Sequence, residues 1–193
     1  AAAIPATLVL FFVSDVLGAG EFAPAFLAAY FAAAAFGMPV WVTLAARVGL
    51  RTAWLIGMSV SVVAFVWTLG LGHGDRFEFA LICLLTGVAL GADLAMPPAL
   101  LATVIEQAGH RARREGAYFG IWTLATKLNL ALAAGVGLPL LGQLGYQPGS
   151  DGSTLALSVA YAALPCALKL AAAYVLVLAP LPDRERPAGE SPT

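Results

Sequence analysis

Six stretches of the chain are long and apolar enough to cross a lipid bilayer as helices. The hydrocarbon core of a bilayer is about 30 Å thick, and a helix needs roughly 20 apolar residues to cross it. We predict spans at about residues 2–17, 22–45, 52–71, 77–104, 117–142 and 154–180. Charged residues make up only 11% of the chain, against about 25% in an ordinary soluble domain. The chain is therefore predicted to be an all-α membrane protein.

The two ends of the chain differ from the apolar runs between them. The chain begins with "AAAIPATLVLFF", which lacks the basic residues that open a signal peptide. We expect this start to lie inside a longer helix, as in a fragment or a truncated protein. Residues 181–193 are rich in proline and charge, which predicts a disordered tail. The predicted organisation is a six-helix membrane lobe over residues 1–180 followed by this tail.

Arginines are distributed unequally between the two sides of the predicted lobe. The segments after the second, fourth and sixth spans contain Arg47, Arg51, Arg111, Arg113, Arg114, Arg184 and Arg186. The segments after the first, third and fifth spans contain only Arg76. Because loops rich in Lys and Arg stay in the cytoplasm, the sequence predicts a cytoplasmic C-terminus. The predicted location is a membrane, with the bacterial inner membrane as the expected one.

Three ionisable residues lie deep inside predicted spans: Asp93, Lys127 and Lys169. Such residues are expensive in a bilayer and commonly mark functional sites. At about 1.5 Å of rise per residue, Asp93 and Lys127 lie about 16 Å and about 15 Å from the cytoplasmic ends of their spans. Lys169 is about 16 Å from the end of its own span by the same rise, and a ligand role, a peripheral packing role or a lipid-facing role is open for it.

Asp93 and Lys127 have opposite charges at equal depth on consecutive helices, which predicts a pair or two walls of one polar cavity. A buried ion pair that only fixes helix packing is the alternative. Polar and amphipathic neighbours favour a solute path: Thr123 lies one helical turn before Lys127, and Trp122, Thr126 and Asn129 are close along the chain. We predict a substrate-binding set of Lys127, Thr123, Trp122, Asp93 and Asn129.

Other polar or unusual residues indicate no further chemistry. No serine–histidine–aspartate or HExxH pattern is visible, so no enzyme is predicted. The two cysteines lack metal-site or disulfide spacing, and no cofactor or metal is expected. The glycines of "GVALGAD" and "AAGVGLPLLG" are interpreted as surfaces where helices pack closely.

The segment "LLATVIEQAGHRARREGAYFGIWTLATKLNLALAAG" followed by "LGQLGY" resembles a signature of the glycoside–pentoside–hexuronide:cation symporters, which include the melibiose carrier and belong to the major facilitator superfamily. The matching residues are Ala102, Glu106, Arg113, Arg114, Glu115, Gly116, Tyr118, Phe119, Lys127, Gly145 and Tyr146. Two positions depart from the family pattern, because Thr103 stands in place of an acid and Trp122 in place of a glutamine that is common in sugar carriers. The expected solute is therefore a sugar or another small polar solute.

The resemblance implies a twelve-helix fold of which this chain is the C-terminal half, built as two three-helix repeats. It implies that the spans with Asp93 and Lys127 line a central cavity and that the span with Lys169 is peripheral. It also implies coupling to Na⁺ or H⁺, with the main cation site in an N-terminal half outside this chain. The expected function is alternating-access symport, and the expected partners are the bilayer, the N-terminal lobe or a second copy, and the solute. Nucleic acid is not an expected partner.

The charged cluster between the fourth and fifth spans has two possible roles. Glu106, Arg111, Arg113, Arg114 and Glu115 either set the membrane topology alone or also gate the cytoplasmic side through ion pairs. Two other functions remain open for the whole chain: a degenerate or structural half-transporter without transport of its own, and a six-span protein that acts as a homodimer.

Overall fold

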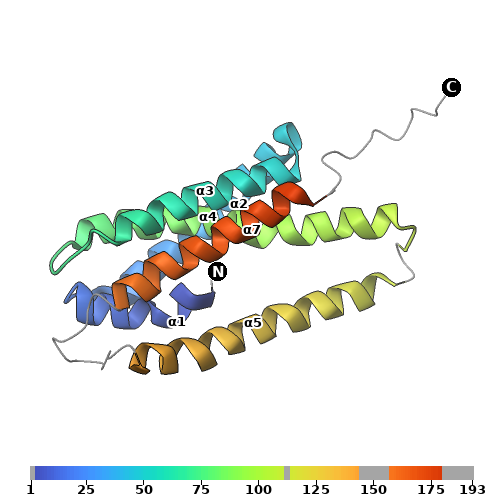
Figure 1. Ribbon diagram of the computed structural model, residues 1–193. Coiled ribbons are helices and arrows are strands. Elements are labelled where there is room, and N and C mark those ends of the chain that lie inside the picture. Colours follow the sequence, from blue (N-terminus) through green and yellow to red (C-terminus); the bar gives the residue numbers. More distant parts are fainter. Residues whose placement is uncertain (1–2, 111–113, 144–156, 180–193) are drawn as a thin grey trace.

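The computed structural model describes residues 3–110, 114–143 and 157–179, and every regular element in these ranges is helical. Figure 1 shows an elongated bundle in which the long helices run roughly alongside one another. The long helices are α2 (Ala23–Val48), α3 (Leu50–Thr68), α4 (Arg76–Gln107), α5 (Glu115–Gln143) and α7 (Leu164–Leu178). The predicted all-α class is confirmed.

Short helical turns adjoin the N-terminal helix, α2 and α7. Helix α1 (Ala3–Phe11) continues into a π-helical turn, η1 (Phe12–Val16), and α7 is preceded by a π-helical turn, η3 (Val159–Ala163). A single 3₁₀ turn, η2 (Gly20–Phe22), leads into α2. Each predicted span thus contains a helix or helical turns in the described part of the chain.

Four helical segments of the described chain are long and apolar enough to cross a membrane. They are Gly20–Val48, Leu50–Thr68, Arg76–Gln107 and Val159–Leu178. The apolar segment Ala3–Val16 is shorter than a span, and α5 is not among the four. The second, third, fourth and sixth predicted spans are therefore supported by length and composition, whereas six spans and a half-transporter arrangement stay predictions.

Helix α4 is the centre of the bundle because it packs against both α2 and α3. Its contact with α2 is close at two glycines one helical turn apart. A Cβ atom added at Gly87 would lie 2.3 Å from the backbone oxygen of Tyr30, and one at Gly91 would lie 3.0 Å from that of Ala34. Glycine at both positions lets the two backbones approach, as the "GVALGAD" stretch predicted.

Aromatic side chains join the two π-helical turns at one end of the bundle. Phe12 of η1 stacks on Tyr161 of η3 with ring centroids 4.5 Å apart, and both are buried. Phe79 of α4 packs against Phe12 in a tilted arrangement, and Phe26 of α2 packs edge to face against Phe79. This cluster places α1, α2, α4 and the start of α7 around one apolar core.

Polar contacts at the two ends of the bundle are consistent with the predicted alternation of loops. Arg51 at the start of α3 donates a hydrogen bond to the backbone oxygen of Val177 at the end of α7. At the opposite end, Gly74 N donates to the oxygen of Leu17, and Arg76 pairs with Glu21 at 3.7 Å. Arg51 and Arg76 therefore lie at opposite ends, as expected for loops on opposite sides of a membrane.

Helix α5 differs from the other long helices in its packing. Its contacts are mainly with α1, and Figure 1 shows it running along the outside of the bundle. Every side chain from Ile121 to Leu132 is exposed. The middle of α5 is therefore not covered by the other described helices.

Candidate functional site

A buried ion pair joins α4 to α7 in the middle of the bundle. The Nζ of Lys169 donates to Oδ2 of Asp93 at 2.5 Å, and the two side chains are 5% and 20% exposed. The indole Nε1 of Trp54 on α3 donates to the other carboxylate oxygen, Oδ1, at 3.0 Å. Each oxygen of Asp93 thus has a charged or polar donor, as a buried carboxylate requires.

This pairing corrects the expectation that Asp93 pairs with Lys127. Helix α7 packs on α3 next to α4, and this places the aliphatic stem of Lys169 where its amine reaches the carboxylate. Helix α5 packs mainly on α1 instead, and Lys127 is exposed. Of the roles left open for Lys169, the lipid-facing one is excluded, because this residue is only 4% exposed.

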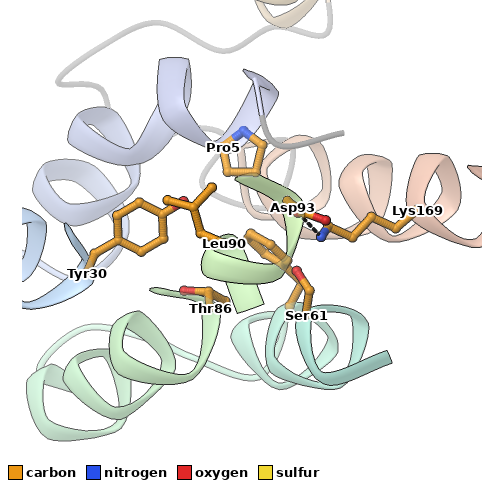
Figure 2. A pocket seen from close by; sticks show the side chains of 8 residues that line it. Pro5, Tyr30, Ser61, Thr86, Leu90, Asp93 and Lys169 are labelled. Atoms are coloured by element: carbon orange, nitrogen blue, oxygen red, sulfur yellow. Dashed lines mark hydrogen bonds and ion pairs between the residues drawn. The ribbon is translucent and has the colours of Figure 1, made fainter. Parts of the chain in front are cut away.

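A small cavity borders the ion pair on the side of α2 and α1. Figure 2 shows Asp93 and Lys169 on one side of it and Tyr30 on the other. Its lining side chains come from five helices: Pro5, Tyr30, Ser61, Phe65, Thr86, Leu90, Asp93 and Lys169. Water centres can occupy about 20 Å³ of it, which is room for about one water molecule. A cavity of this size has room for a water molecule beside the pair but is too small for a sugar.

Two consecutive prolines weaken α4 directly beside the pair. Pro97 and Pro98 lie inside the helix and lack the N–H groups that would bond to the backbone oxygens of Asp93 and Leu94, four residues earlier. The four-residue offset between Asp93 and Pro97 was the signal that could have connected them.

The other predicted site residues gather on one side of α5. Successive residues of a helix are about 100° apart, which places Asn129, Trp122, Thr126, Thr123 and Lys127 within an arc of about 160°. The apolar residues Phe119 and Leu130 lie in the same arc. The opposite arc contains Ile121, Leu124, Ala125, Leu128, Ala131 and Leu132. We call the first arc the α5 polar face and the second the α5 apolar face. The structure separates the polar face, with Lys127, from Asp93 and its partners.

The charged cluster after α4 is described only in part. Glu106 and Gln107 lie at the end of α4, and Arg114 and Glu115 lie at the start of α5, all exposed. His110 Nδ1 and the hydroxyl of Tyr118 are 2.9 Å apart, so the connection between the two helices is closed by a hydrogen bond. Arg111, Arg113, Gly145, Tyr146 and the tail at 181–193 lie outside the described residues.

A family model described as MFS/sugar transport protein matches residues 1–183, which is nearly the whole chain of 193 residues. No curated protein sequence matches the chain.

Proposed function

The chain belongs to the MFS/sugar transport protein family, and from that premise we propose that it is the C-terminal lobe of a cation-coupled secondary transporter. Membership supports a sugar-type transporter of the major facilitator superfamily, and a transporter rather than an enzyme. The proposal adds three features: coupling to Na⁺ or H⁺, alternating access, and a sugar or another small polar solute. We also propose that the chain corresponds to the C-terminal half of a transporter of the melibiose-carrier type.

The observation that carries the proposal is the α5 polar face. Lys127 lies near the middle of a 29-residue helix and is exposed. A lysine at the centre of a bilayer costs about 2.5–3.5 kcal/mol on insertion scales, so this face is not expected to contact lipid. Within the described residues, no other helix covers it. A water-filled path between this lobe and an N-terminal six-helix lobe provides the polar environment that the face requires.

A polar solute in that path would meet groups suited to recognise hydroxyls. Lys127 is a cationic donor, Thr123 and Thr126 each have a hydroxyl, and Asn129 provides both a donor and an acceptor. Trp122 adds a flat apolar surface for the less polar side of a sugar ring. We propose these residues, rather than Asp93, as the direct solute contacts, because both carboxylate oxygens of Asp93 already have protein donors. The main cation site is proposed for the N-terminal lobe.

The membrane orientation follows from the arginine distribution and gives a testable prediction. With the α2–α3 connection in the cytoplasm and the α3–α4 connection outside, V48C should react with an impermeant thiol reagent only after the inner side is opened. F77C should react from outside in intact cells. Val48 and Phe77 are 40% and 79% exposed, so burial does not hide either position. Labelling of V48C from outside and of F77C only from inside would contradict the proposed orientation.

The proposed function is tested by uptake into proteoliposomes that contain the intact protein. A panel of radiolabelled sugars and other small polar solutes would be offered with an inward Na⁺ gradient, with an inward H⁺ gradient, and with no gradient. We expect at least one solute to accumulate above its external concentration under one gradient, and an ionophore that collapses the gradient to abolish the accumulation. Uptake that only equilibrates under every gradient would contradict cation coupling while leaving transport itself intact.

A further inference from the structure

Helix α4 has a mechanically weak point at Asp93. Pro97 leaves the backbone oxygen of Asp93 without its helical N–H partner, and Pro98 does the same for Leu94. Sharp bends in long helices occur at such places. In this structure α4 nevertheless continues as one helix from Arg76 to Gln107. Something outside the α4 backbone is therefore expected to fix the angle between its two halves.

The Asp93 side chain has the contacts needed for that purpose. It is held from two directions, by Trp54 on α3 at 3.0 Å and by Lys169 on α7 at 2.5 Å. A second contact in the same region, from Cys166 Sγ to the backbone oxygen of Val62 at 3.6 Å, ties α7 to α3. Helices α3 and α7 thus form one support, and the Asp93 carboxylate attaches α4 to it at the weak point.

From this juxtaposition we propose that Asp93, Lys169 and Trp54 form a clamp that holds the two halves of α4 in line, and that opening the clamp lets the half from Asp93 to Gln107 bend during transport. The inference rests on the proposed function, because it assigns a step of alternating access to this lobe. Lys169 and Asp93 are then positioning residues, which act on the solute path through the angle of α4. The pair that fixes helix packing is thus Asp93 with Lys169, and it lies at the proposed hinge of α4.

The surroundings favour opening rather than a permanently locked pair. The cavity beside Asp93 has room for about one water molecule and is lined by the hydroxyl groups of Tyr30, Ser61 and Thr86. These hydroxyl groups and a water molecule can form hydrogen bonds with the carboxylate or the amine when the two separate. Titratable groups near the pair among the described residues include Tyr30, which lines the same cavity, and Cys166, which lies three residues before Lys169 on α7. Among the described residues that line the cavity, Lys169 is the only one with a positive charge to pair with Asp93.

The clamp is tested by distance measurements between spin labels at the ends of α4 and α7. Labels at Q107C and L178C, both exposed in the structure, would be introduced into the intact protein with its other reactive cysteines removed. The segment from residue 93 to residue 107 is about 21 Å long, so a bend of about 20° at Asp93 moves its end by about 7 Å. The D93N/K169M double variant removes both charges and leaves neither one buried alone, so it is the main variant.

We expect D93N/K169M to shift or broaden the label distance by several ångströms, on the order of the calculated 7 Å. The charge-exchanged variant D93K/K169D restores an ion pair, but its lysine at position 93 cannot accept the hydrogen bond from Trp54, so it should return the distance only part of the way to the wild-type value. The K127M control should not alter the distance. In uptake assays the double variant should change the maximal rate more than the apparent KM, because it alters a conformational step and no solute contact. A wild-type distance in D93N/K169M would overturn the clamp. Since the distances need no transport, they also distinguish failure of the clamp from failure of the proposed function.

Discussion

Lys127→Ala is expected to lower gradient-driven uptake by about tenfold to about a hundredfold. A hydrogen bond to a charged group contributes about 1.5–3 kcal/mol, and each 1.4 kcal/mol corresponds to about a factor of ten. The loss should appear in initial rates of uptake at low solute concentration, measured with equal amounts of protein in each vesicle preparation. Folding should change little, because Lys127 is exposed in the lobe.

Two matched variants make this result specific. Lys127→Arg keeps the positive charge and should retain more uptake than the alanine variant. Leu128→Ala changes the next residue, which lies on the α5 apolar face, and should leave uptake within about twofold of wild type, as expected for a surface change of about 0.5 kcal/mol or less. Undiminished uptake in Lys127→Ala would remove Lys127 from the solute path.

Gly87→Leu is expected to prevent α2 and α4 from packing and so to cause the largest loss of folded protein. Even a single Cβ atom at this position would lie 2.3 Å from the backbone oxygen of Tyr30 and 2.9 Å from the Cβ of Ala33. Overpacking of a core commonly costs about 1–3 kcal/mol, and here a helix backbone must move rather than a flexible side chain. The expected result is a much lower yield of monodisperse protein in detergent and a lower melting temperature.

Gly135→Leu provides the control for this substitution. Gly135 also lies within a long helix, but a Cβ atom added to it meets no atom within 4 Å. The same increase in side-chain size and helix propensity should therefore leave yield and melting temperature near those of the wild type. If the two leucine variants behave alike, the close contact of α2 with α4 is not what stabilises the lobe.

The helices could be predicted from the sequence because they depend on local composition, whereas the orientation in the membrane stays a prediction. Apolar runs predicted helices at each of six places, and the structure has helical segments there. Glycines predicted close helix contacts in two stretches, and Gly87 and Gly91 of the first form one with α2. The prediction is wrong for Gly135 and Gly142 of the second stretch, where an added Cβ atom meets no atom within 4 Å. The arginine distribution predicted which connections share a side, and Arg51 and Arg76 lie at opposite ends of the bundle.

The partner of Asp93 could not be predicted because depth does not determine direction. Helical rise placed Asp93, Lys127 and Lys169 at nearly the same level, at about 15–16 Å from their helix ends. Which lysine reaches Asp93 depends on how α5 and α7 are arranged around α4, and this arrangement is a tertiary property. Adjacency along the chain favoured Lys127, whereas the packing of α7 on α3 selected Lys169. The role of Trp54, which is 39 residues from Asp93 in sequence, had no sequence signal.

The central claim, that the α5 polar face lines a water-filled path, is tested most directly by comparing cysteines on the two faces of α5. T123C and T126C lie on the polar face, and L124C and L128C lie on the apolar face at similar depth. Each would be treated with a membrane-impermeant thiol reagent in the intact protein in vesicles, because thiols react as thiolates and therefore where water reaches them. We expect fast modification of T123C and T126C and little modification of L124C and L128C. Faster modification of L124C and L128C than of the two threonine positions would contradict it.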